Sequence, residues 1–256
     1  MSEFKYIQFM LAEGIARITL SRPKHNVLNI EMMKELGSKI EELASDQDLK
    51  ALVILGEGRS WCAGVDVAEH KPDMVDVMMR AFNRIFELLD TLKVPTIAAV
   101  HGAALGGGME LAIGCDIIIA ATSATFGQPE IKLGFFPPYA AVRLPQLVGP
   151  AKALEICVTG KTYTAAQACS MGLVSSVVED KVFQEELEKL IGEIKASSPL
   201  IIRLNKQAVK THLGMDFNEA LQGVTDLFLN TLMKTEDTLE GIASFYEKRK
   251  PRWKNR

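Results

Sequence analysis

The stretch that decides the fold runs from Val100 to Leu111 and reads Val-His-Gly-Ala-Ala-Leu-Gly-Gly-Gly-Met-Glu-Leu. Its apolar start is typical of a buried strand, and its glycines lead into a helix. Consecutive glycines leave backbone N–H groups uncrowded, so the turn is either an anion site or simply a tight structural turn. A dinucleotide loop does not fit, because Leu111 stands where that motif needs a third glycine or an alanine.

Two glutamates flank this region and are candidates for proton transfer. Glu110 lies in the expected first turn of the helix, where a carboxylate either pairs with the helix dipole or acts as a general acid or base. Glu130 follows Gln128-Pro129 in an expected loop with many apolar neighbours. Such a carboxylate is either paired structurally or tuned for proton transfer. The residues alone leave both alternatives open.

Hydrophobic spacing predicts an α/β fold in the first two thirds of the chain. Strands that alternate with helices indicate right-handed βαβ units and a parallel sheet, which follow an opening hairpin. The expected strands are 4–11, 16–20, 51–55, 96–100 and 116–121, and the expected helices are 30–43 and 74–92.

From Ala151 onward the pattern is mostly helical and predicts a C-terminal helical layer. Its methionines and leucines at helical spacing are typical of packing or subunit contacts. The expected helices are 151–159, 164–171, 182–196, 199–212, 216–232 and 236–248.

Composition narrows the class of protein. Of the 256 residues, 48% are hydrophobic and 24% are charged, as in soluble globular proteins. The net charge of −3 gives no long-range attraction for nucleic acid, and no apolar run is long enough for a membrane span. The four cysteines show no metal-binding spacing, so no metal site is expected, and the start does not resemble a signal peptide. A cytoplasmic location is therefore expected.

Several motifs together resemble the crotonase superfamily, also called the enoyl-CoA hydratase/isomerase superfamily. The main ones are Ala104–Leu111, Cys115-Asp116-Ile117 and Phe126–Glu130. The resemblance covers nearly the whole chain, and the combination is specific although each piece alone is weak. The supporting pieces are Ser21–Lys24, Trp61–Asp66, Leu144-Pro145, Leu147–Gly149, Thr159-Gly160, Gly172–Val174 and Phe245–Arg249.

The resemblance implies a spiral core of ββα turns over residues 1–198 and a helical trimerisation region over 199–256, in a homotrimer or a hexamer built from two trimers. It also implies an acyl-CoA thioester substrate whose carbonyl is held by the N–H groups of Val65 and Gly107. Such donors stabilise the enolate that forms when water adds to the β-carbon. No separate cofactor is implied, because coenzyme A belongs to the substrate.

In the hydratases of this family, two glutamates hold the water, and both are present here as Glu110 and Glu130. Two carboxylates in one pocket do not easily both carry charge, so one is expected to be protonated near neutral pH. Similar isomerases often keep only the second glutamate. The presence of Glu110 therefore favours hydration over isomerisation.

Coenzyme A is expected to contact residues of two neighbouring subunits. The resemblance implies contacts with Lys24, Ala63 and Asp66 of one subunit, and with Phe245 and Lys248 of a neighbouring subunit. Without the resemblance, the basic run from residue 248 to 254 would be interpreted as a solvated tail. A non-enzymatic, RNA-binding role for this tail is the alternative from a different class, which the acidic balance and the glutamate pair disfavour.

The chain departs from the usual pattern at residues 134–141, where ordinary hydratases are rich in glycine. Pro138 replaces a glycine whose N–H helps to hold the water, and proline has no N–H. With Phe136 and Tyr139 it predicts a stiff, apolar wall, for which core packing is the alternative. His70 is either a pocket residue or a surface histidine.

This wall, with residues 64–70, is similar to the cyclohexa-1,5-diene-1-carbonyl-CoA hydratases of anaerobic aromatic degradation. The similarity implies 1,4-addition of water to a cyclic dienoyl thioester, which yields 6-hydroxycyclohex-1-ene-1-carbonyl-CoA. A general 2-enoyl-CoA hydratase of fatty-acid oxidation is the alternative, followed by an enoyl-CoA isomerase. The residues do not decide which glutamate is the acid.

Overall fold

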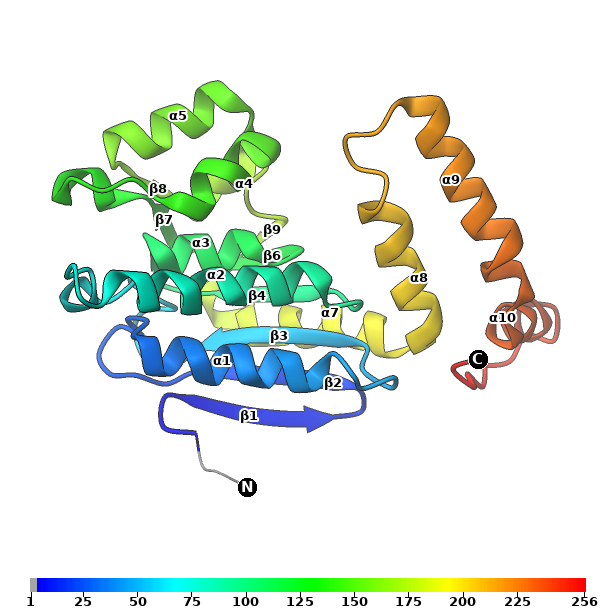
Figure 1. Ribbon diagram of the computed structural model, residues 1–256. Helices are drawn as coiled ribbons and strands as arrows, with labels where there is room; N and C mark the ends of the chain where they lie inside the picture. The colour runs from blue at the N-terminus through cyan, green and yellow to red at the C-terminus, as the bar shows by residue number, and fades with distance from the viewer. Residues whose placement is uncertain (1–3) are drawn as a thin grey trace.

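A six-stranded sheet forms the centre of the molecule. The computed structural model describes residues 4–256, and Figure 1 shows the sheet crossed by helices on both faces. The strand order is β1-β2-β3-β4-β6-β9, with β1 antiparallel to β2 and every later pair parallel. Its strands are β1 (Ile7–Ala12), β2 (Ile15–Leu20), β3 (Ala51–Gly56), β4 (Thr96–Val100), β6 (Ile117–Ala121) and β9 (Ser176–Val178).

A second sheet of three short strands lies beside the first and carries the glycine turn. Its order is β5-β7-β8, in which β5 (Ala103–Leu105) pairs parallel with β7 (Thr125–Gly127), and β7 pairs antiparallel with β8 (Thr162–Thr164). Main-chain bonds join the two sheets through Trp61 and Cys62, whose N–H groups donate to His101 and Ala103. Strand and helix thus alternate in a spiral of ββα turns.

Helices cover both faces of the large sheet because the central strands are apolar on both sides. Every residue of β4 is buried, as is typical of parallel strands covered on two faces. One face packs against α1 (Ile30–Leu43), α2 (Val75–Thr91) and α3 (Gly107–Gly114), and the other packs against α7 (Phe183–Lys195). The remaining core helices are α4 (Pro138–Val148), α5 (Pro150–Thr159) and α6 (Ala165–Ser170), with short 3₁₀ turns η1 (Val67–Glu69), η2 (Pro129–Leu133) and η3 (Asp180–Val182).

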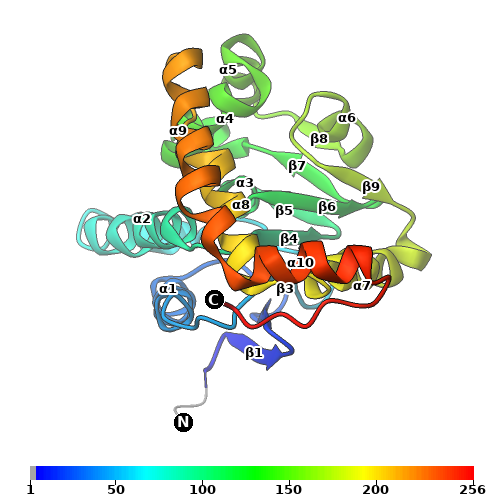
Figure 2. The ribbon, with the colours of Figure 1, turned by 90° about the vertical axis from the view of Figure 1, so that its right-hand side faces the viewer.

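Three helices form a layer that stands apart from the spiral core (Figures 1 and 2). They are α8 (Pro199–Lys210), α9 (Phe217–Asn230) and α10 (Glu236–Tyr246), with η4 (Leu232–Lys234) before the last. No residue of α9 is buried, and its exposed side chains include Phe217 and Leu221. The layer is attached to the core through α8, where Lys206 Nζ donates to Asp116 Oδ2 at 2.6 Å and to the Val94 carbonyl at 2.8 Å.

The basic C-terminal segment is not a free tail. Asp237, which is fully buried, accepts main-chain N–H bonds from Lys254 and Asn255 and a hydroxyl bond from Ser198, the residue that caps α8. Asn255 also donates to the Gln47 carbonyl of the core at 2.8 Å. The interpretation of this run as a solvated tail is therefore wrong, because its backbone closes the helical layer.

The hairpin, the parallel strands and the helices expected from the sequence are confirmed, most of them within one or two residues. Three features were not predicted. The sequence of residues 134–141 predicts only a wall, but Pro138 begins α4. The short strands β5, β7, β8 and β9 were also missed, and Glu130 lies in η2 rather than in an irregular loop. No helix within residues 4–256 has the length and apolar character needed to cross a membrane.

Candidate functional site

A cavity of about 560 Å³ lies where α2, α3, η2 and the start of α4 meet. The loop Ala63–Val65 forms one side and the segment 129–138 forms the other. Most of its lining is apolar, and the polar side chains are Glu110, Glu130, His70 and Lys132. The cavity thus combines an apolar wall with a few convergent polar groups, which is the usual composition of a small-molecule site.

Glu110 enters the cavity from the first turn of α3 and is only 2% exposed. The N–H of Ala140, at the start of α4, donates to Glu110 Oε1 at 2.8 Å. Burial raises the pKa of Glu110 to about 7; the charge of Glu130 adds to this, and N–H groups of Ala140 and Tyr139 oppose it. A carboxyl with a pKa raised in this way can both accept and deliver protons near neutral pH.

Glu130 faces the glycine turn from η2. Burial raises its pKa to about 7 as well. The fully buried Gln128 stands beside it, and with the amide nitrogen turned toward the carboxylate, it donates to both Glu130 oxygens at 3.0 Å. A Cβ on Gly106 would lie 2.5 Å from Glu130 Oε1, so the carboxylate touches the turn itself. Two carboxyl groups with pKa values near 7 therefore share one cavity.

The glycine turn is shaped by close backbone approach. Gly106 has φ = +53°, and a Cβ on Gly108 would lie 2.1 Å from the Cys62 carbonyl oxygen. A Cβ on Gly107 would meet Val65 Cγ2 at 2.5 Å and the Val65 nitrogen at 3.4 Å. The main-chain nitrogens of Val65 and Gly107 therefore lie next to each other at the edge of the cavity, beside Glu110 and Glu130.

The structure brings together most of the residues expected at the substrate. Ala63, His70, Phe136 and Pro138 all line the cavity. The expected wall is corrected at Tyr139, which does not line it. The side chain of Tyr139 lies against the core, and its ring stacks on that of Phe86 with centroids 3.7 Å apart, because α4 turns successive side chains to different faces.

The residues expected to bind coenzyme A lie in separate places. Lys24 is exposed on the loop beside Ala63, whose N–H donates to the carbonyl of His25 at 2.9 Å. Asp66 is already engaged, because it pairs with Arg22 at 2.9 Å and caps η1. Phe245 and Lys248 do not line the cavity of their own chain; they lie at the exposed end of α10, where Phe245 is 78% exposed.

Sequence reasoning missed two polar partners of the glutamates, the Ala140 N–H and the Gln128 side chain. A signal for the first was available, since Pro137-Pro138 followed by helix-forming residues is typical of a helix N-terminus. Such a terminus directs N–H groups at nearby anions, here Glu110. Nothing in the sequence shows that Gln128 is fully buried.

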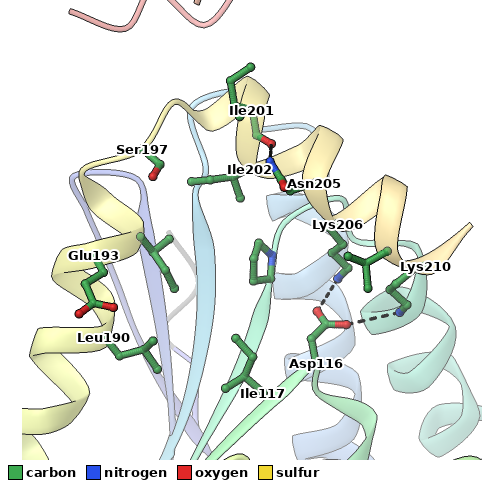
Figure 3. A pocket seen from close by; sticks show the side chains of 13 residues that line it. Asp116, Ile117, Leu190, Glu193, Ser197, Ile201, Ile202, Asn205, Lys206 and Lys210 are labelled. Carbon is green, nitrogen blue, oxygen red and sulfur yellow. Dashed lines mark hydrogen bonds and ion pairs between the residues drawn. The ribbon is translucent and has the colours of Figure 1, made fainter. Parts of the chain in front are cut away.

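A second cavity of about 540 Å³ lies between α7, α8 and the end of the sheet (Figure 3). Three of its four charged side chains, Asp116, Lys206 and Lys210, are paired with one another, and the fourth, Glu193, is exposed. Asp116 accepts from Lys206 at 2.6 Å and from the Thr96 N–H at 2.9 Å, and it lies 3.5 Å from Lys210 Nζ. Burial raises the pKa of Asp116, but Lys206 outweighs it and holds the pKa below its ordinary value. This cavity therefore offers no group poised for proton transfer.

No cluster of three or more metal-binding side chains occurs among residues 4–256. Two of the four cysteines, Cys62 and Cys115, are buried, and burial raises the pKa of each thiol to about 12. Both thiols therefore stay protonated and pack as small apolar groups. The polar groups that face the first cavity are carboxyl, imidazole, ammonium and main-chain N–H groups.

Comparison with known proteins agrees with this geometry. The family model for enoyl-CoA hydratase/isomerase matches residues 11–256. The chain belongs to this family. It is 37% identical to a short-chain-enoyl-CoA hydratase of Clostridium acetobutylicum, with 92% of each chain covered, and 36% identical to a crotonyl-CoA hydratase of Syntrophomonas wolfei, with 93% of this chain and 94% of the relative covered.

The fold agrees as well. A crystal structure of an enoyl-CoA hydratase subunit from Geobacillus kaustophilus superposes with a TM-score of 0.90 at 36% identity, over the full length of both chains. The expected crotonase-type fold is therefore confirmed, and the chain is an enzyme of the hydro-lyase class.

Proposed function

We propose that this enzyme adds water to a cyclic, conjugated dienoyl-CoA, with Glu110 and Glu130 as its catalytic pair. The observation that carries the chemistry is the pair itself: two carboxyl groups with pKa values raised to about 7, facing one cavity beside two main-chain N–H groups. A general acid or base works best when its pKa lies near the working pH. Family membership supports the coarser statement that the enzyme is an enoyl-CoA hydratase.

The proposed reaction uses the groups in fixed roles. The thioester oxygen lies against the N–H groups of Val65 and Gly107, which stabilise the negative charge that develops there. The ionised carboxylate takes a proton from water as the water oxygen bonds to the β-carbon. The protonated carboxyl gives its proton to carbon as the enolate collapses. The pair ends with one proton, as it began, so the enzyme is regenerated.

Pro138 changes how the water is held. Proline has no N–H to donate to the water. The N–H of Ala140, in the first turn of α4, donates to Glu110 Oε1 at 2.8 Å and not to the water. The glutamate side chains then carry the positioning of the water. Ala140 fixes one of them, and Gln128 holds the other.

The cyclic substrate is supported by the shape of the cavity wall. Phe135, Phe136, Pro137 and Pro138 follow one another along one side. The prolines fix their backbone angles and the Phe135 ring packs against His70, so this side of the cavity suits a compact ring better than a flexible chain. In the ring, water attacks the β-carbon, the charge spreads through the second double bond, and the proton is placed at the far end of the diene.

We propose further that coenzyme A extends from the cavity past Ala63 toward Lys24, with Asp66 acting indirectly through its ion pair with Arg22. Phe245 and Lys248 would complete the site from a second subunit in a homotrimer or a dimer of trimers. The exposed apolar side chains of α9, which include Phe217 and Leu221, support such an assembly. A cytoplasmic location belongs to the same proposal.

A general 2-enoyl-CoA hydratase is the second candidate, and the names of the relatives favour it. The deciding experiment measures kcat/KM for cyclohexa-1,5-diene-1-carbonyl-CoA and for crotonyl-CoA with one enzyme preparation. We expect the cyclic thioester to be preferred at least tenfold. A preference for crotonyl-CoA would overturn the ring substrate and leave the general hydratase.

A further inference from the structure

His70 and Lys132 are the polar side chains of the cavity that the proposed reaction does not use, and His70 is the one held in place by its neighbours. It follows η1, half-buried, and lines the cavity with Glu110 and Glu130. Its position is fixed on two sides: Nδ1 lies 3.0 Å from the carbonyl oxygen of Asp66, and the ring centroid lies 5.1 Å from that of Phe135. A histidine held in this way keeps one orientation toward the cavity.

The hydrogen bond to Asp66 determines which nitrogen carries the proton. A carbonyl oxygen only accepts, so Nδ1 must donate, and in the neutral ring Nε2 is then an acceptor with a free lone pair. Among residues 4–256, no hydrogen bond to Nε2 is formed. The ring therefore presents an acceptor that has no partner of its own within the described chain.

The place of this acceptor relative to the reacting carbons follows from the loop. Asp66 directly follows Val65, and its N–H donates to the carbonyl of Leu28 at 2.8 Å, which fixes the backbone next to the proposed thioester site. His70 folds back onto Asp66 within one turn of η1. The imidazole therefore lines the same cavity as Val65, five residues after the proposed thioester site.

We propose that His70 is a specificity-determining residue that distinguishes the hydrated acyl group from the unsaturated one. The two ligands differ by one hydroxyl group, and an acceptor such as Nε2 binds a hydroxyl donor that an alkene cannot supply. His70 thus stabilises the bound hydroxyacyl thioester without taking part in proton transfer. The inference rests on the hydratase activity of the proposed site, not on the identity of the ring substrate.

The test uses a ligand pair that is independent of the cyclic substrate. KM is measured for 3-hydroxybutyryl-CoA in the dehydration direction and for crotonyl-CoA in the hydration direction, with wild type, His70→Leu and His70→Gln. A hydrogen bond contributes about 0.5–1.5 kcal/mol, so His70→Leu should raise KM for the hydroxyacyl thioester about three- to tenfold and leave that for crotonyl-CoA within about twofold. His70→Gln keeps an acceptor and should recover part of the loss.

His101→Leu is the matched control, because His101 bonds the Gly58 carbonyl at 2.9 Å and does not line the cavity. It should change neither KM. Equal increases of both KM values in His70→Leu would show a merely structural role and overturn the inference, as would no change in either. A preference of the wild type for crotonyl-CoA over the cyclic thioester would overturn only the proposed ring substrate.

Discussion

Replacing Glu110 by glutamine should make the folded protein more stable at alkaline pH while removing its activity. The wild-type carboxyl is 2% exposed, and burial raises its pKa from an ordinary value of 4.5 to about 7. A difference of one pKa unit corresponds to about 1.4 kcal/mol, so the ionised group costs the fold about 3 kcal/mol. Glutamine carries no charge and keeps an oxygen for the Ala140 N–H.

The sign of the pH dependence follows from proton binding. Because the pKa is higher in the folded state, the folded protein binds more protons between about pH 4.5 and 7, so its stability falls as the pH rises through this window. Below pH 4.5 the carboxyl is protonated in both states and the penalty vanishes. The gain from Glu110→Gln is therefore absent at pH 4 and complete above pH 7.

The expected gain is about 2 kcal/mol at pH 8.5, after allowing about 1 kcal/mol for the new, unpartnered amide N–H groups. For a chain of this length, this corresponds to a rise in Tm of about 4–8 °C. Differential scanning calorimetry at pH 4 and pH 8.5, at one protein concentration, measures it. Glu155→Gln is the control, since the Glu155 carboxylate pairs with Lys152 at the surface and should give no gain.

Two results would refute this reasoning. If Glu110→Gln is no more stable than wild type at pH 8.5, burial does not penalise the charged form. If the gain is the same at pH 4, it comes from packing and not from ionisation. In either case the pKa of Glu110 would not lie near 7, and its role as an acid or base at neutral pH would lose its basis.

Three further outcomes are expected. Glu110→Gln and Glu130→Gln should each lower kcat about 10²- to 10⁴-fold with little change in coenzyme A binding, and near wild-type turnover in either variant would contradict its catalytic role. The wild-type kcat should pass through a maximum near pH 7 in a pH-rate profile. Gly107→Pro removes an N–H donor, whereas the control Gly107→Ala keeps the donor and only adds a Cβ. The proline variant should therefore lower kcat/KM more than about 100-fold beyond the loss in the alanine variant. Equal losses would show that the effect comes from packing. Asp116→Ala leaves the buried Lys206 without its carboxylate and should destabilise the fold by about 3–5 kcal/mol in denaturant unfolding. Adding Lys206→Met should recover much of the lost stability. Additive losses in the double variant would exclude coupling of the pair.

The helices and long strands could be predicted because their signals are local. Residues 30–43 carry an apolar stripe at helical spacing, and Asn29 caps the first turn through a bond to the Met32 N–H. The α1 helix therefore begins and ends where the sequence predicts. The strand Thr96–Val100 is equally clear, since it is apolar after Thr96 and bounded by Pro95 and His101-Gly102.

The short strands could not be predicted in this way. Strand β5 has three residues and pairs with β7, about twenty residues later in the chain, so long-range pairing and not local preference defines it. The proposed catalytic pair also depends on long-range contacts. Glu110 and Glu130 are separated by the strands β6 and β7, and only the folded chain shows that they face one cavity. The family resemblance predicts the pair. The raised pKa values could not be predicted, because they depend on the burial of both side chains, which only the structure shows.

The binding of the C-terminal segment to Asp237 has a practical consequence for proteolysis. Residues 248–256 are rich in lysine and arginine, so the sequence alone marks them as trypsin targets. Their backbone is nevertheless engaged, because Arg252, Lys254 and Asn255 donate main-chain N–H bonds to buried or half-buried carboxylates. Trypsin can cut there only after local opening. The rate at which trypsin removes this segment therefore reports on local unfolding of the helical layer.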